Sequence, residues 1–164
     1  MTSINPKTKK DRPEIKIDSE EAIDNFGNEI FEQTIKLFVD ESYKTFKEGI
    51  KKAQEEKDKN KMKILTHTLK TSARYMASEN FALECQALES ETKNPDWEKM
   101  DNLLIDFYED IDILYNECMK YYNEYNNLNR IDNINTENTE EKRKMKIKKN
   151  KKIIFSILLF NNFL

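Results

Sequence analysis

Residues 64–89 read ILTHTLKTSARYMASENFALECQALE and indicate how the chain folds. Within this stretch, and just before it, apolar residues recur at spacings of three and four positions. Such a period places one apolar stripe along an α-helix. The period restarts after Met76, so we expect two consecutive helices, over about 61–76 and 79–91. Their stripes are Met62, Leu65, Leu69, Ala73 and Met76 in the first helix, and Phe81, Cys85 and Leu88 in the second.

The same period is found upstream. A capping box begins at Asp18, with Glu21 three residues later, and predicts a short helix that ends near Phe26. One long amphipathic helix is expected from Asn28 to the charged turn at 55–61. Its apolar stripe is Phe31, Ile35, Phe38, Phe46, Ile50 and Ala53, with Ser42 in the one gap.

Downstream, Pro95 breaks the pattern and Asp96 can cap a last helix. The apolar stripe of this helix is Met100, Leu103, Leu104, Phe107, Ile111, Leu114, Cys118 and Tyr121. Short connections between amphipathic helices make neighbouring helices antiparallel. We therefore expect an all-α fold over residues 18–122, an up-down-up-down four-helix bundle with a short extra N-terminal helix.

The composition excludes several classes of function. The chain of 164 residues has 2 glycines, 1 histidine and 2 cysteines. A phosphate-binding loop and a dinucleotide-binding turn both need several glycines, so a nucleotide-binding kinase or dehydrogenase is excluded. The histidine and the cysteines cannot supply four zinc ligands. Cys85 and Cys118 lie on apolar stripes, where a free cysteine packs as a small hydrophobic residue.

Charge is distributed unevenly along the chain. Eight of the 28 basic residues lie in 142–152, and no acidic residue follows Glu141. Residues 1–141 therefore carry 20 basic and 31 acidic residues, a net charge of −11, whereas residues 142–164 carry +8. An acidic folded part argues against nucleic acid as its partner.

Three segments lie outside the expected bundle. Residues 1–17 and the Asn-rich linker 123–141 have no apolar period, and we expect both to be disordered. The basic run in 142–164 is typical of a nuclear import signal or of a weak membrane contact. The last 12 residues, IIFSILLFNNFL, are mostly apolar and would form a helix of about 18 Å, too short to span a bilayer.

His67 lies on the first of the two helices in the opening stretch. It is two residues from both Leu65 and Leu69, about 200° around the helix from the apolar stripe, so its side chain should face water. A lone exposed histidine is also compatible with a solvated side chain that has no role. Three basic residues share its helix face: Lys63, Lys70 and Arg74.

An exposed imidazole among cations has a definite chemistry. Near neutral pH one ring nitrogen has a free lone pair, which can attack phosphorus. Nearby cations would stabilise the phosphoryl group, which adds a charge of roughly −2. The pattern fits a carrier that accepts a phosphoryl group and passes it on.

Residues 64–89 also resemble a family signature. Histidine-containing phosphotransfer (HPt) domains read approximately A-H-x-L-K-G-S-[SA]-x-x-x-G-A-x-x-L-x-x-x-C-x-x-L-E. The resemblance covers about residues 18–122, and it joins an H-x-L-K match to a distant C-x-x-L-E match at the expected separation. The residues that match in register are His67, Leu69, Lys70, Ser72, Ala73, Cys85, Leu88 and Glu89.

The resemblance implies a role for each matched position. His67 would accept the phosphoryl group and Lys70 would stabilise it, without ATP binding, kinase activity or a cofactor in this chain. The partners implied are receiver domains of a hybrid histidine kinase and of a response regulator, which would supply the Mg²⁺. The surface expected to contact a receiver domain consists of Lys63, Ile64, Thr68, Thr71 and Arg74.

Two positions depart from the signature. Thr71 replaces the glycine that follows the lysine, and Ala77 replaces the second glycine, where it keeps a small side chain at a helix end. Thr71 leaves open an alternative, an HPt-like adaptor that binds receiver domains without phosphotransfer. A second alternative is a membrane-surface protein held by the tail 142–164. We expect a location in the cytoplasm or nucleus, because residues 1–17 lack the apolar run of a secretory signal. We also expect a monomer, because one core accounts for the apolar residues and no sustained heptad extends beyond it.

Overall fold

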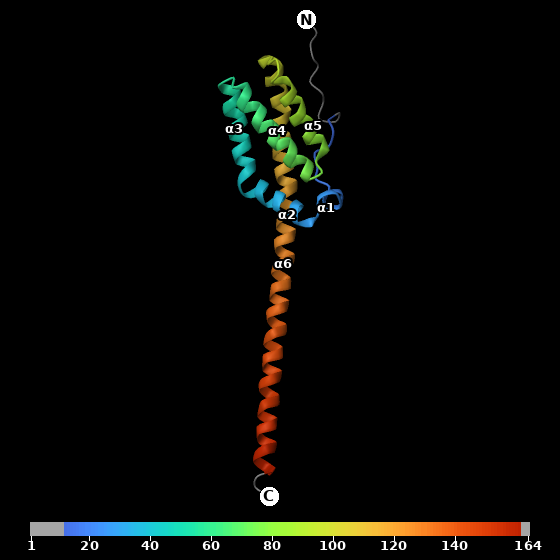
Figure 1. Cartoon of the computed structure of the whole chain (residues 1–164), viewed down its shortest axis with the longest axis vertical. Coiled ribbons are helices and arrows are strands. Elements are labelled where there is room, and N and C mark those ends of the chain that lie inside the picture. The colour runs from blue at the N-terminus through green and yellow to red at the C-terminus, as the bar shows by residue number, and fades with distance from the viewer. Residues whose placement is uncertain (1–11, 162–164) are drawn as a thin grey trace. The chain divides into compact units, whose positions relative to one another are not determined.

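The computed structural model describes the backbone of residues 12–161. Beyond Leu128, side chains are described at Arg130, Glu140, Arg143, Lys144, Met145 and Lys148. The fold is all-α, as predicted, and residues 12–161 contain no strand. The helices are α1 Ser19–Phe26, α2 Asn28–Leu37, α3 Tyr43–Glu55, α4 Lys59–Tyr75, α5 Glu79–Glu91 and α6 Trp97–Asn161 (Figure 1).

The chain divides into two units, Met1–Tyr122 and Asn123–Leu164. In the first unit α4 packs against both α3 and α5. The part of α6 that belongs to this unit contacts α5 through stacked rings of Phe81 and Phe107, whose centroids are 5.5 Å apart. In the part of the chain that the structure describes, no helix is both long and apolar enough to cross a membrane.

Aspartate side chains cap three helices. Asp18 Oδ1 accepts a hydrogen bond from the Glu21 backbone N–H at 3.0 Å, and Asp96 Oδ1 accepts one from Lys99 at 3.2 Å. These two caps were predicted from the sequence. Asp58 caps α4 in the same way, accepting from the N–H groups of Asn60 and Lys61 at 3.0 Å each. Each cap satisfies N–H groups that have no partner within the helix.

The long helix expected from Asn28 is interrupted by a turn of π-helix, Phe38–Ser42. In a straight α-helix, the eight residues from Phe38 to Phe46 would rotate Phe46 about 80° off the stripe. A π-turn accommodates one extra residue, so the eight-residue step covers about two turns and Phe46 returns to the core. The gap at Ser42 in the periodic pattern is where this extra residue is inserted.

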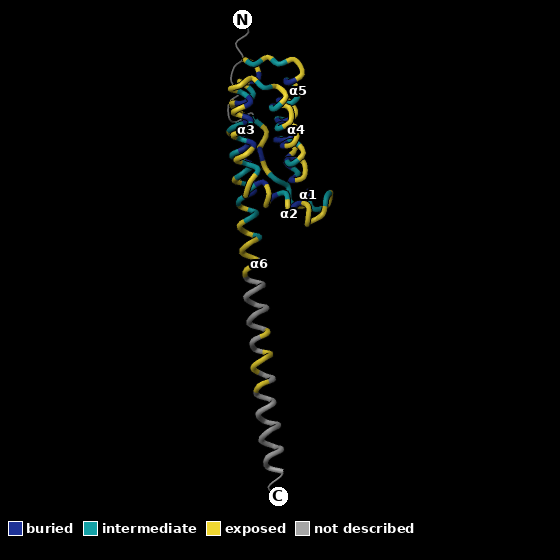
Figure 2. The backbone as a smooth tube through the Cα atoms, turned by 60° about the vertical axis from the view of Figure 1, so that its left-hand side comes forward, coloured by how far each residue is buried: buried dark blue, intermediate teal, exposed yellow. Residues whose placement is uncertain are grey.

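The buried apolar core consists of most residues of the predicted stripes together with Ile15, Ala22 and Ala82. Figure 2 shows the buried positions along the backbone in dark blue. Leu65, Leu103 and Tyr121 are the half-buried exceptions among the stripe residues. Thr66 was not predicted to be in the core, yet it is fully buried, and its hydroxyl group donates to the carbonyl oxygen of Met62 at 2.8 Å. That hydrogen bond removes the cost of burying the hydroxyl group.

The turns before α2 and before α5 each contain a residue with positive φ, a glycine in one and an alanine in the other. Gly27 joins α1 to α2 with φ at +87°, a conformation that disfavours other residues. Ala77 joins α4 to α5 with φ at +49°, although it is not a glycine. The Ser78 N–H bonds the carbonyl oxygen of Ala73 at 2.9 Å, which closes a Schellman motif. The replacement of glycine by Ala77 therefore costs backbone strain, which side-chain size alone did not indicate.

The structure describes residues 12–17 of the N-terminal segment that was expected to be disordered. They lie against the helices, with Ile15 buried, and residues 1–11 lie outside the described part. The Arg12 guanidinium group pairs with three carboxylates of α6, those of Asp106, Glu109 and Asp110, at 2.5, 2.9 and 3.1 Å. The polar composition of the segment hid this because the acidic partners are more than 90 residues away in sequence.

Residues 123–141 also differ from expectation, because α6 continues through them as helix. The missing apolar stripe and the many asparagines of this segment favour disorder. However, neither glycine nor proline occurs after Pro95, and each residue added to an existing helix gains a backbone hydrogen bond. Continuation from the packed start of α6 therefore needs no new nucleus.

Candidate functional site

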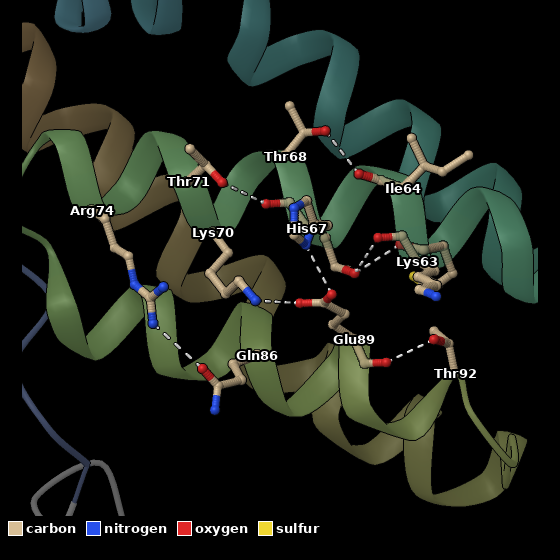
Figure 3. A network of polar contacts seen from close by, with 12 residues as sticks. Lys63, Ile64, His67, Thr68, Lys70, Thr71, Arg74, Gln86, Glu89 and Thr92 are labelled. Atoms are coloured by element: carbon tan, nitrogen blue, oxygen red, sulfur yellow. Dashed lines mark hydrogen bonds and ion pairs between the residues drawn. The ribbon is translucent and has the colours of Figure 1, made fainter.

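His67 lies on α4, and 61% of its side chain is exposed. The exposure agrees with its position opposite the apolar stripe. We use the name His67 surface for this histidine and the six residues predicted around it (Figure 3). These six residues are Lys63, Ile64, Thr68, Lys70, Thr71 and Arg74.

The imidazole of His67 is held from α5. Its Nδ1 lies 2.9 Å from Oε1 of Glu89, whose side chain is only 17% exposed. Hydrogen bonds from Lys70 and then His67 outweigh partial burial and keep the pKa of the Glu89 carboxyl below its usual range. An ionised carboxylate only accepts hydrogen bonds, so Nδ1 is the nitrogen that carries the proton. In the neutral ring the lone pair is then on Nε2.

Lys70 lies on the His67 face, as its position in the sequence predicts, but it is already paired. Its Nζ donates to Oε2 of Glu89 at 2.5 Å, and only 14% of its side chain is exposed. The two oxygens of one carboxylate thus hold the ring and the ammonium group side by side. An ammonium group has three donors, so Lys70 can keep this contact and still donate to an incoming anion.

The other two cations lie at the ends of the His67 surface. Arg74 donates to the Gln86 side chain at 3.5 Å, which ties it loosely to α5. Lys63 is exposed, and no hydrogen bond or ion pair joins its ammonium group to the residues that the structure describes. The positive charge of Lys63 is therefore available to a partner.

Apolar and hydroxyl-bearing residues form the remaining part of the His67 surface. Ile64 is 65% exposed, one of several large apolar side chains on the described surface, and it adds nonpolar area next to His67. The hydroxyl groups of Thr68 and Thr71 donate back to the carbonyl oxygens of Ile64 and His67, at 2.9 and 3.2 Å. With these hydroxyl groups satisfied, the exposed threonines offer a partner mainly nonpolar surface.

Glu89, which contacts both His67 and Lys70, is the residue of the candidate site that sequence reasoning did not identify. It was matched as the last letter of the signature, with no role attached. A signal was available, because Glu89 follows the buried Leu88 on a helix that pairs with the cationic face of α4. Recognising its role requires the register of α4 against α5, which only the structure provides.

A second carboxylate of α5, Glu84, is held in a different way. Its Oε2 and Oδ2 of Asp110 are buried and receive no hydrogen bond from another donor. Two ionised carboxylates cannot hydrogen-bond each other, so a hydrogen bond between Glu84 and Asp110 needs a proton on one of them. Burial and then the neighbouring Asp110 raise the pKa of Glu84 to about 9, and Arg12 opposes the shift. Glu84 is therefore protonated at neutral pH.

The two cysteines have no part in the site. Both are buried as free thiols, and burial raises the pKa of each thiol well above its usual range. Cys118 Sγ lies 3.4 Å from Sδ of Met76, within the core. A buried thiol of raised pKa is a poor nucleophile, which confirms the interpretation of both cysteines as packing residues.

Comparisons of the chain with protein-family models, with curated proteins and with solved structures found no match. The support for a function comes from the resemblance of residues 64–89 to the HPt signature and from the contacts around His67.

Proposed function

We propose that the chain is a phosphorelay intermediate of the HPt type. It accepts a phosphoryl group on His67 from an aspartyl phosphate of one receiver domain and passes it to another. The observation that carries this proposal is the contact between His67 Nδ1 and Glu89, because it leaves the Nε2 lone pair on an exposed ring nitrogen.

In the proposed transfer step, one bond forms and one bond breaks, and no cofactor of this chain takes part. Nε2 of His67 attacks phosphorus, a P–N bond forms, and the bond from phosphorus to the aspartate oxygen breaks. The aspartate leaves as a carboxylate with the electron pair of that bond. The ring becomes positively charged because Nδ1 keeps its proton, and the carboxylate of Glu89 stabilises this charge through the 2.9 Å contact.

Cations then compensate the phosphoryl oxygens. Lys70 is the nearest, because it shares the carboxylate of Glu89 with the ring. Lys63 and Arg74 add positive charge at the two ends of the His67 surface, where they would also attract the acidic, Mg²⁺-binding site of a receiver domain. Ile64, Thr68 and Thr71 would give that partner a dry contact beside the ring.

The scaffold that we propose is an up-down-up-down four-helix bundle. Its four helices would be α2 with α3, then α4, then α5, then the first part of α6, and α1 would be the extra N-terminal helix. The short connections at 56–58, 76–78 and 92–96 support antiparallel neighbours. We further propose that the protein works as a monomer in the cytoplasm or nucleus.

The test is transfer of label from a panel of phosphorylated receiver domains to the full chain. We expect acid-labile, alkali-stable label on the wild type and none on His67→Gln, because His67 is the only histidine. Lys63→Gln is the matched control, since it removes a cation from the same face and should slow the reaction without abolishing it. Equal labelling of wild type and His67→Gln would exclude the proposal.

Thr71 favours a second candidate function. It is exposed, one helical turn after His67, and its β-branched side chain stands where the signature has glycine. If it keeps a receiver domain too far from the ring, the protein is an adaptor that binds receiver domains without phosphotransfer. In that case the wild type binds but takes no label, whereas Thr71→Gly takes label from the same donors.

A further inference from the structure

The second unit of the chain carries a dense positive charge on a helix. Helix α6 extends through residues 142–152, which contain eight basic residues and no acidic one. At 1.5 Å per residue these charges lie within about 16 Å of helix. The basic side chains described in this segment, those of Arg143, Lys144 and Lys148, are all exposed.

The basic positions are distributed around the whole helix. At 100° per residue they leave no gap wider than about 80° in projection along the axis. A groove or a partner helix would contact a single face and leave the remaining charges unpaired. We call residues 142–152 the collar, because their basic positions encircle the helix. Such a segment fits an environment, such as a layer of lipid headgroups, that can surround the helix with anionic groups.

The residues that follow favour lipid over nucleic acid. Residues 153–160 read IIFSILLF, seven apolar residues and one serine, and α6 continues through them. Phosphates of a nucleic acid would match the lysines but would leave this run in water. As a helix, eight residues measure about 12 Å, close to the half-thickness of about 15 Å of the hydrocarbon layer.

We propose that residues 142–161 attach the protein to an anionic lipid surface. The collar 142–152 lies among the headgroups, and the run 153–160 enters one leaflet without crossing it. Electrostatic attraction and apolar burial act together, so each alone binds more weakly. Attachment does not involve His67 and is therefore independent of the function proposed above.

The test is flotation of the full chain with vesicles of two compositions, phosphatidylcholine alone and phosphatidylcholine with about 30% phosphatidylserine. We expect flotation with the anionic vesicles, loss of it in high salt, and little with the neutral ones. A charge variant replaces Lys148, Lys149, Lys151 and Lys152 by Gln and should weaken binding by at least about tenfold. The matched control makes the same replacement at four exposed lysines of the first unit, Lys36, Lys51, Lys59 and Lys93.

The apolar run is tested by Ile157→Asp in the otherwise complete chain. It should also reduce flotation on anionic vesicles, although the charge of the collar is unchanged. The proposal would be overturned if the wild type did not float with the vesicles. It would also be overturned if flotation were the same on neutral and anionic vesicles and the same for the charge variant. A third contrary result is tight binding to duplex DNA or RNA that is unchanged in Ile157→Asp. The last would make nucleic acid the partner.

Discussion

Glu84 and Glu89 are the same residue type on the same helix, five positions apart, yet their carboxyl groups behave in opposite ways. Glu89 faces two basic side chains, and its pKa lies below the usual range. Glu84 faces the buried Asp110, and its pKa is raised to about 9. One turn of α5 therefore separates a carboxylate that organises the His67 surface from a protonated acid that closes the packing against α6.

The difference shows that partner charge and burial, rather than residue type, determine what a carboxyl group does. Glu89 has two basic neighbours on α4 and stays partly exposed. Glu84 has one cation nearby, and Arg12 is already shared among three other carboxylates. Substitutions that remove the partners of Glu84 and those that alter Glu89 can therefore test the two environments separately.

Removing the acceptor at Glu89 should have the largest effect. Glu89→Leu leaves Nδ1 of His67 without a partner, so the ring is no longer held with Nε2 free, and we expect phosphoryl transfer to slow by about 10- to 100-fold. Transfer rates from one receiver donor measure this, and NMR of the single imidazole reports which nitrogen carries the proton. Glu89→Gln keeps an acceptor and should restore most of the rate. Unchanged rates in Glu89→Leu would show that the contact has no role.

Breaking the other environment should affect stability instead. Arg12→Ala leaves the buried carboxylate of Asp110 without its cation, and we expect the free energy of unfolding to fall by about 2 kcal/mol. Urea titration measures this. Lys16→Ala, an exposed residue of the same segment, should change it little. If both variants are equally stable, residues 12–17 do not contribute to the fold as described.

The dependence of stability on pH should differ in sign between the two acids. The folded-state pKa of Glu84 is raised, so its favourable contribution is complete below the unfolded value near 4.5 and is lost as the pH rises toward 9. Glu89 has a lowered pKa, so its contribution is present above the unfolded value and is lost as the pH falls through the folded value.

Glu84→Gln isolates the first of these two effects. The amide cannot ionise and can still donate to Asp110, so near pH 8 the variant should be more stable than the wild type. The advantage should disappear below pH 4.5. Urea titrations at several pH values check this, and a constant difference across the range would contradict the raised pKa.

The smallest expected effect is at the turn before α5. Ala77→Gly relieves the strained φ of +49° and should stabilise the protein by about 0.5 to 1 kcal/mol. The free energy of unfolding should rise by the same amount at every pH, because this substitution changes no ionisable group. An increase that varied with pH in thermal or urea unfolding would mean that the turn sets the environment of Glu84 or Glu89.

The sequence predicted what depends on neighbours along the chain. Periodicity identified the core stripes and the exposure of His67, and capping residues identified the helix starts at Asp18 and Asp96. Neither signal could predict the contact of His67 with Glu89 or the three ion pairs of Arg12, because these depend on how separate helices meet. The π-turn and the strain at Ala77 were missed for another reason: both are backbone conformations that residue type alone does not specify.

Gly49 lies where α3 and α4 approach each other closely. A β-carbon built on this residue of α3 would lie 3.0 Å from Cδ1 of Leu65 on α4, closer than ordinary contact allows. Leu65 is two residues before His67. A larger side chain at position 49 would push the end of the Leu65 side chain aside by a few tenths of an ångström, on the face of α4 opposite His67. The absence of a side chain at Gly49 therefore lets α3 approach closely the helix that presents His67 on its other face.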